Sequence, residues 1–292
     1  MNIQKLKQNK SIKELLEFGI INIDKSSGPT SFNISDFVRK KLGLRKTSHF
    51  GTLDPKVTGV LPIALNRACK LTGFFLEKDK EYVGIMRIHE DISLENVKEV
   101  INKKFLGKIK QTPPVKSRVK RQERLREIKK FDLIEKDEKN ILFRVECEAG
   151  TYIRKLIDDL GKELGIGAHM LELRRVRAGI FEEEGSVNLY NFEKAVDKYK
   201  NGDEKDLKEI IIPAEETLKK IFPCVQVKEE EIKRLYTGKS IFKEDLIVKK
   251  KFEKEKIVGI FSKNKFIGMY EIVNTKNIFA RPKFVMQPIG GK

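Results

Sequence analysis

The sequence predicts an α+β protein with a separate, strand-rich C-terminal part. Two stretches, Lys80–His89 and Leu142–Glu148, alternate between apolar and polar side chains, which is typical of half-buried strands. In other segments, such as 31–42, the apolar residues recur at helical spacing instead. From residue 221 onward, short β-type runs alternate with turns rich in Lys and Gly. Strands and helices therefore share the first part of the chain, and strands dominate the last part.

The chain of 292 residues is long enough for a full core and two domains. Residues 1–18 are Lys-rich with a short apolar face, and we expect an N-terminal arm, frayed or docked on a partner rather than part of a core. Residues 19–220 are expected to form the main domain. Residues 221–292 are expected to form a second, smaller domain.

The charge balance is strongly basic, with 61 Lys and Arg against 43 Asp and Glu and a formal net charge of +18. Such an excess raises the affinity and the association rate for a phosphate-rich partner. An anionic membrane surface is the alternative, but no apolar run approaches a transmembrane span and no secretory signal is expected. An ordinary solvated surface would also be rich in Lys and Glu. That explanation accounts for the abundance of charged residues but not for the excess of Lys and Arg over Asp and Glu. We therefore expect nucleic acid as partner and no membrane.

Neither the cysteines nor the histidines suggest a metal site. The three cysteines, Cys69, Cys147 and Cys224, are far apart and odd in number, which favours a reducing cytoplasm over a disulfide framework or a zinc knuckle. The three histidines show no ligand spacing. The sequence has no Walker loop, no dinucleotide fingerprint and no Gly-x-Ser-x-Gly elbow. We expect neither a metal nor a cofactor.

One acidic residue, Asp54, lies where the chain cannot be helical. Pro55 disfavours the α region for Asp54, and Gly51 and Gly59 supply permissive backbone on both sides. The apolar run 60–65 that follows is expected to be a buried strand. An acid on a stiff loop beside a buried element is well placed for chemistry. Local chemistry alone favours the simpler interpretation, in which Asp-Pro only opens a turn.

The segment Gly51–Gly59 resembles the signature loop of the TruB/dyskerin family of RNA pseudouridine synthases. Asp54 falls on the catalytic aspartate of that family, and His49 also matches the motif. The ending Lys-Val-Thr-Gly is more similar to the archaeal and eukaryotic guide-RNA (box H/ACA) branch than to the bacterial one. The segment Lys25–Ser31 resembles the first family motif, with Ser26 in place of a proline.

A second match, Gly150–Gly161, is expected to form a helix capped by Thr151. Arg154 would lie in its first turn, where the helix dipole disfavours a cation. This broken rule indicates a specific anionic partner, and the resemblance implies that the partner is Asp54.

The resemblance also implies the remaining site residues. Tyr82 falls on the active-site tyrosine of the family, although a tyrosine in a strand is often only structural. The third match runs from Leu173 to Phe181, and Leu173 would line the base pocket. The extended basic segment 111–121 suits a phosphate backbone, although a solvated loop would explain its charge equally well. The expected RNA-binding residues are Lys25, His49, Lys116, Arg118, Lys120, Leu173, Arg174 and Arg175. For Lys25 and His49, support of the loop that carries Asp54 is the alternative.

From the resemblance we expect the pseudouridine synthase fold, a mixed and mostly antiparallel sheet with flanking helices, followed by a small C-terminal β-barrel similar to a PUA domain. The implied activity is isomerisation of uridine to pseudouridine in tRNA (uridine 55 of the T-loop), or guide-directed in rRNA, or both. The implied partners are tRNA or rRNA, a box H/ACA guide RNA and accessory ribonucleoprotein proteins. Asp54, Tyr82 and Arg154 would be catalytic. Asp54 would either attack the sugar or the base, or act as a base on the ribose.

Two alternatives belong to other functional classes. A non-catalytic RNA-binding scaffold of a box H/ACA particle would explain the charge and the C-terminal module, but it would not need all three catalytic residues. A two-carboxylate nucleoside hydrolase needs a second acid near Asp54, and no motif supplies one.

Overall fold

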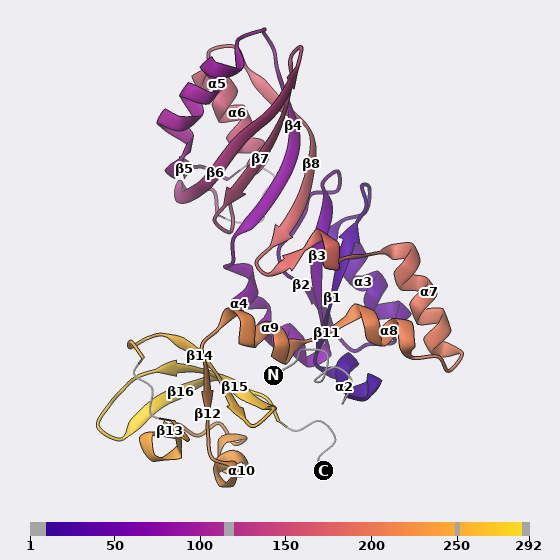
Figure 1. Ribbon diagram of the computed structural model, residues 1–292, viewed down its shortest axis with the longest axis vertical. Coiled ribbons are helices and arrows are strands. Elements are labelled where there is room, and N and C mark those ends of the chain that lie inside the picture. Colours follow the sequence, from indigo (N-terminus) through magenta and orange to yellow (C-terminus); the bar gives the residue numbers. More distant parts are fainter. Residues whose placement is uncertain (1–9, 114–119, 249–251, 288–292) are drawn as a thin grey trace. The chain divides into compact units, whose positions relative to one another are not determined.

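The computed structural model describes residues 10–113, 120–248 and 252–287 (Figure 1). The chain divides into two compact units. The first, which we call the sheet unit, comprises residues 21–64 and 71–210. The second, the terminal unit, comprises the residues up to 20, residues 65–70 and the chain from 211 onward.

A large sheet forms the centre of the sheet unit, with the strand order β10-β1-β3-β8-β4-β7-β6-β5. The strands are β1 (Gly19–Lys25), β3 (Thr58–Leu65), β4 (Lys80–Ile88), β5 (Gly107–Gln111), β6 (Arg124–Asp137), β7 (Asn140–Cys147), β8 (Ala168–Ala178) and β10 (Val187–Asn188). Two short strands extend it: β2 (Thr47–His49) pairs with β3, and β9 (Phe181–Glu182) pairs with β8. The pairs β4–β8, β4–β7, β6–β7 and β5–β6 are antiparallel, whereas β3–β8 and β1–β10 are parallel. The expected mixed, mostly antiparallel sheet is confirmed.

Both strands predicted from alternation are present, and their alternate residues are buried. In β4 the residues from Lys80 to Met86 alternate between buried and half-buried, and in β7 Phe143, Val145 and Cys147 face the core. β4 lies between β7 and β8, so its backbone is paired along both edges (Figure 1).

Helices flank this sheet. They are α3 (Ser31–Lys41), α4 (Thr72–Leu76), α5 (Leu94–Val100), η2 (Ile101–Phe105), α6 (Ile153–Glu163), η3 (Glu183–Gly185), α7 (Leu189–Lys200) and α8 (Lys205–Ile210). Thr30 caps α3, because its hydroxyl accepts a hydrogen bond from the Asn33 backbone N–H. The expected cap of α6 is wrong. The N-cap position is Tyr152, and the Thr151 hydroxyl instead donates to the Glu148 carbonyl at 2.7 Å.

The terminal unit contains the strand-rich module predicted for the end of the chain. Its five strands, in the order β12-β14-β15-β16-β13, form a curled half-barrel (Figure 1). They are β12 (Cys224–Gln226), β13 (Ile241–Phe242), β14 (Ile257–Ser262), β15 (Lys265–Ile272) and β16 (Ile278–Val285). Its other elements are η1 (Asn66–Leu71), β11 (Ile211–Pro213), α9 (Ala214–Ile221), η4 (Glu229–Glu231), α10 (Ile232–Leu235) and η5 (Lys243–Asp245). Apolar residues of these strands and of α10 form a core of their own.

The described part of the N-terminal segment is packed, which differs from the frayed or docked arm that we expected. Helix α2 (Ile12–Glu17) begins with a capping box between Ser11 and Glu14. Ile12 and Leu15 are buried, and Lys10 forms an ion pair with Glu215 of α9. Two or three apolar side chains therefore suffice to fold this short helix onto the terminal unit, because the burial of apolar surface outweighs its weak helix-forming tendency. Residues 1–9 lie outside the described part of the chain.

Candidate active site

Asp54 lies on a short loop between β2 and β3, which we call the Asp54 loop (residues 50–57). Gly51 has φ +105° and Gly59, at the start of β3, has φ +100°, a region that residues with a side chain rarely adopt. Inside the loop, the Val57 N–H donates to the Asp54 carbonyl at 3.0 Å. The Asp54 side chain keeps 47% of its surface exposed. The carboxylate is thus presented to solvent from a tight turn.

Two buried side chains, Lys25 and Ser31, are hydrogen-bonded to the backbone of the Asp54 loop. Lys25 is fully buried, and its ammonium donates to three backbone carbonyls, those of Ser26 (2.9 Å), Pro55 (2.9 Å) and Val57 (2.8 Å). The Ser31 hydroxyl accepts from the Leu53 N–H at 2.8 Å and donates to the Leu53 carbonyl at 3.0 Å. Burial lowers the pKa of Lys25, the nearby Asp54 charge opposes this, and the Arg175 charge adds to it. Of the two roles expected for Lys25, support of the loop and contact with RNA, its burial favours the first.

Arg154 brings a second sequence motif to the Asp54 loop. It lies in the first turn of α6, and its Nη2 is 2.7 Å from Asp54 Oδ2. The side chain of Arg154 is 62% exposed, so the pair opens toward solvent. A neighbouring guanidinium stabilises a carboxylate in its charged form and restricts its orientation. The structure therefore brings together the two residues that the resemblance pairs.

Gln111 orients the start of α6, a role that the sequence did not reveal. Its side chain is buried, its amide donates to the Tyr152 carbonyl at 3.2 Å, and its oxygen accepts from the Tyr152 N–H at 3.1 Å. These two bonds satisfy backbone groups next to the helix end that carries Arg154. Gln111 opens the basic segment that we expected to bind RNA, so its position was marked but its role was not.

Tyr82 and Leu173 lie on the two adjacent strands β4 and β8. Tyr82 is only 9% exposed and Leu173 8% exposed. Gly84, opposite Leu173 in the ladder, makes room for it, because a Cβ there would lie 2.9 Å from Leu173 Cδ1. Burial raises the pKa of the Tyr82 phenol and the Arg175 charge opposes this rise, so the phenol is neutral near neutral pH. These side chains offer an apolar and aromatic wall rather than a charged one.

His49 ends β2 beside the Asp54 loop. Burial lowers its pKa, and the Arg175 charge lowers it further, so the imidazole is neutral near pH 7. Its Nδ1 is buried without a hydrogen-bond partner among the described residues.

The two arginines of the basic cluster on β8 do not both face outward. Arg174 forms ion pairs with Asp24 (3.0 Å) and with Glu183. Arg175 is 1% exposed and donates to the carbonyls of Val60 (2.8 Å) and Gly51 (3.1 Å). The expectation that Arg175 contacts RNA is therefore wrong, because the side chain is enclosed by protein. Arg174 already has two carboxylates as partners.

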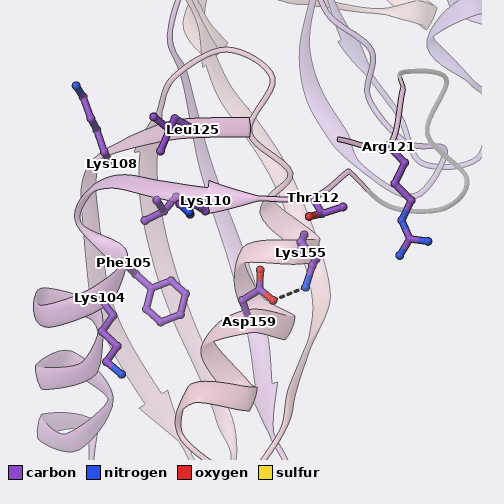
Figure 2. A pocket seen from close by; sticks show the side chains of 10 residues that line it. Lys104, Phe105, Lys108, Lys110, Thr112, Arg121, Leu125, Lys155 and Asp159 are labelled. Atoms are coloured by element: carbon purple, nitrogen blue, oxygen red, sulfur yellow. Dashed lines mark hydrogen bonds and ion pairs between the residues drawn. The ribbon is translucent and has the colours of Figure 1, made fainter. Parts of the chain in front are cut away.

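Of the three expected contacts in the segment 111–121, only Lys120 lies within the described residues, and it is exposed. Lys116 and Arg118 lie outside them. A hollow of about 690 Å³ adjoins this segment. It is lined by Lys104, Phe105, Lys108, Ile109, Lys110, Thr112, Arg121, Leu125, Lys155 and Asp159. Figure 2 shows Lys155 turned toward Asp159 on α6, so this cation is already neutralised. None of Asp54, Tyr82 and Leu173 lines the hollow, which is separate from the Asp54 loop.

Residues 10–113, 120–248 and 252–287 contain neither a cluster of metal ligands nor a helix able to span a membrane. Within them, no three His, Cys, Asp or Glu side chains gather as a metal site. None of the helices seen there combines the length and the apolar character needed to cross a membrane.

Comparison with known proteins points to one family. A family model described as TruB family pseudouridylate synthase (N terminal domain) matches residues 39–153, and one described as tRNA pseudouridylate synthase B C-terminal domain matches residues 154–219. A probable tRNA pseudouridine synthase B of Methanocaldococcus jannaschii is 44% identical over 234 residues, which cover 80% of this chain and 69% of the relative. The protein of the same name in Methanococcus aeolicus is 42% identical over 279 residues, which cover 94% and 84%.

Solved structures agree with these sequence matches. A chain of a Cbf5-Nop10-Gar1 complex superposes with a TM-score of 0.89 at 33% identity, covering 97% of this chain and 89% of that chain. A chain of an H/ACA RNP bound to a substrate RNA containing 2'-deoxyuridine gives a TM-score of 0.87 at 31% identity, with the same coverage of both chains.

Proposed function

The chain belongs to the TruB family of pseudouridylate synthases, and on that premise we propose that Asp54 carries the isomerisation of uridine to pseudouridine. The observation that supports this assignment is the 2.7 Å contact between Asp54 and Arg154 on a loop bounded by glycines. An exposed carboxylate with a bound guanidinium and an immobile backbone meets the requirements of a reactive group that must stay charged and aimed.

The isomerisation is balanced within the substrate. The N1–C1′ bond breaks, the uracil turns over, the C5–C1′ bond forms, and the proton lost from C5 is replaced by one gained at N1. Asp54 acts as the nucleophile toward sugar or base, or as the base on the ribose. Both routes need an ionised and immobile carboxylate. Arg154 stabilises its charge, and Lys25 and Ser31 hold its backbone.

Tyr82 and Leu173 form the surface against which the uracil packs. A base inside RNA structure must be extruded before its glycosidic bond can be reached. The neutral phenol ring and the leucine side chain then replace the stacking that the base loses. The phenol keeps its proton near neutral pH, so we assign Tyr82 to packing against the uracil rather than to removal of the C5 proton.

The substrate is RNA: tRNA at uridine 55, or rRNA selected by a guide RNA, or both. The names of the archaeal relatives support tRNA, and the titles of the structural neighbours support an H/ACA particle with accessory proteins. The net charge of +18 suits a polyanionic partner. We assign residues 19–220 to catalysis and the half-barrel within 221–292 to RNA binding, as in a PUA domain. Cys69, Cys147 and Cys224 form no disulfide with one another, which supports a reducing, cytoplasmic location.

Tritium release from RNA that carries 5-³H-uridine tests the proposal. The purified protein is assayed on a tRNA transcript alone, and on an rRNA fragment with a box H/ACA guide RNA and accessory proteins. We expect release from the wild type, and a loss of at least about 10³-fold in kcat for Asp54→Asn with unchanged RNA affinity. Asp91→Asn, which alters an exposed carboxylate paired with Lys136, is the matched control.

Release by Asp54→Asn at the wild-type rate would overturn the assignment of Asp54. Tight RNA binding without release by the wild type in either assay would favour the non-catalytic scaffold instead. Release at position 55 without guide RNA would establish tRNA as a direct substrate.

A further inference from the structure

Arg175 lies between the Asp54 loop and Tyr82. We propose that it is a positioning residue that keeps the Asp54 carboxylate at a fixed position relative to the Tyr82 ring while the uracil turns over. This inference rests on the proposed function of Asp54. Arg175 touches neither the solvent nor, by its burial, the substrate, so it would act only through these two residues.

Arg175 is hydrogen-bonded to the backbone near the start of the Asp54 loop and just beyond its end. At the start of the loop, Arg175 Nη2 donates to the Gly51 carbonyl at 3.1 Å. Beyond its end, Arg175 Nε donates to the Val60 carbonyl at 2.8 Å. The backbones also touch, since Gly59 pairs with Arg175 in the β3–β8 ladder and a Cβ on Gly59 would lie 2.2 Å from the Arg175 carbonyl oxygen. One planar, rigid guanidinium thus fixes the distance between the Gly51 and Val60 carbonyls, which flank the loop.

The same side chain faces Tyr82. Arg175 is opposite Tyr82 in the β4–β8 ladder. Burial raises the pKa of Tyr82, and the charge of Arg175 together with a side-chain hydrogen bond opposes the rise. The guanidinium therefore bonds to the backbone around the loop while its charge acts on the phenol, and β3, β8 and β4 meet at this one residue.

The electrostatic environment makes a purely structural role unfavourable. Arg175 has no carboxylate partner among the described residues, and its charge lowers the pKa values of Lys25, His49 and Lys80. A buried, unpaired cation beside other cations costs free energy that an apolar side chain of similar size would avoid. Local rules are broken in this way mainly where function demands it.

The test compares Arg175→Lys and Arg175→Met with Arg177→Lys. Arg177 lies two residues along β8 and pairs with Glu81 (3.0 Å) and Glu146 (2.8 Å), so its substitution disturbs the same strand without touching the Asp54 loop. The readouts are kcat and KM for tritium release, RNA affinity by filter binding, and amide hydrogen exchange of the peptide that covers residues 50–57.

For Arg175→Lys we expect kcat to fall by about 10²-fold, because the single ammonium of a lysine does not reproduce the separated Nε and Nη2 donors that bond the Val60 and Gly51 carbonyls, and an error of about 1 Å in position has this effect on rate. KM and RNA affinity should stay within twofold of the wild type. Exchange in the peptide 50–57 should speed up at least tenfold while the peptides of α6 and β7 remain protected. Arg175→Met should lose more activity than Arg175→Lys, and Arg177→Lys should change neither kcat nor the exchange of residues 50–57.

Wild-type kcat in both folded Arg175 variants would overturn the inference. So would a loss of protection spread evenly over all peptides, which a merely structural role predicts. If Arg175→Met does not fold, Arg175→Lys decides alone. Failure of the proposed function is recognised separately, because Asp54→Asn would then remain active whatever Arg175 does.

Discussion

Arg154 Nη2 lies 2.7 Å from Asp54 Oδ2, and both side chains are about half exposed. The two residues come from motifs far apart in the sequence, one on a loop before β3 and the other in the first turn of α6. An ion pair in this much solvent contributes little to folding, roughly 0–1 kcal/mol. Its geometry is therefore better explained by the needs of a bound substrate than by stability.

Arg154→Gln should separate these two contributions. We expect the free energy of unfolding in urea to change by less than about 1 kcal/mol, because the pair is solvated. We expect single-turnover tritium release to slow by about 10- to 100-fold, because the carboxylate loses its charge partner and its orientation. Lys162→Gln, which removes an exposed pair with Asp158 on the same helix, is the control. A large loss of stability with unchanged release would contradict this view.

Lys25→Met should destabilise the protein. The substitution leaves the carbonyls of Ser26, Pro55 and Val57 without their buried donor. We expect unfolding free energy to fall by about 2–4 kcal/mol, since each unsatisfied buried group costs roughly 1–3 kcal/mol and some will find water. Lys56→Met, an exposed neighbour in the same loop, should stay within about 0.5 kcal/mol of the wild type. Equal midpoints of chemical denaturation for Lys25→Met and Lys56→Met would show that the three hydrogen bonds of Lys25 do not contribute to the free energy of unfolding.

Lys80 should make stability depend on pH above neutrality. Burial, then the Arg175 charge, lowers the pKa of Lys80 to about 8 from an ordinary 10.5. Between these values the unfolded chain binds the extra proton, so this group makes stability rise with pH, and its penalty is complete below about pH 8. Burial raises the pKa of Cys147 to about 12 from 9.0, and this group acts in the opposite direction above about pH 9.

The difference between Lys80→Met and the wild type isolates the lysine. The unfolding free energy of Lys80→Met minus that of the wild type should fall by on the order of 1 kcal/mol between pH 7 and pH 9. Denaturant titrations at several pH values measure it, with buffers of matched ionic strength. A difference that stays constant over this range would mean that Lys80 keeps its ordinary pKa in the folded protein.

Gly59→Ala should be far more damaging than Gly43→Ala. Both glycines have positive φ, +100° and +62°, but a Cβ on Gly43 meets nothing within 4 Å whereas one on Gly59 meets the backbone of Arg175 at 2.2 Å. We expect a loss of about 1–2 kcal/mol for Gly43→Ala from backbone strain alone. For Gly59→Ala we expect on the order of 4 kcal/mol or more, together with a lower kcat. Thermal denaturation of both purified variants gives the comparison, and equal melting temperatures would count against the close approach of β3 and β8.

The sequence was most informative where a pattern repeats or a motif is long. Alternation predicted β4 and β7, and three motif matches marked the neighbourhoods of Asp54, Arg154 and Leu173. It was least informative about single cations. Arg175 belongs to a basic cluster and is expected to contact RNA, and Lys25 is expected to support the loop or contact RNA, yet both are buried. The residue type alone does not reveal whether a lysine or arginine faces a phosphate in solvent or carbonyl oxygens in the protein interior.

By itself, the sequence indicated the family, strands such as β1, β4 and β7, and the identity of the acid on the loop after β2, because these follow from local patterns and motifs. The resemblance also implied Arg154 as its partner, but only the tertiary structure decided which residues support the loop that carries it: Lys25, Ser31 and Arg175. The physical reason is that buried hydrogen-bonding groups must find partners across strands that are distant in the chain. Those partners exist only once β3, β4 and β8 lie side by side.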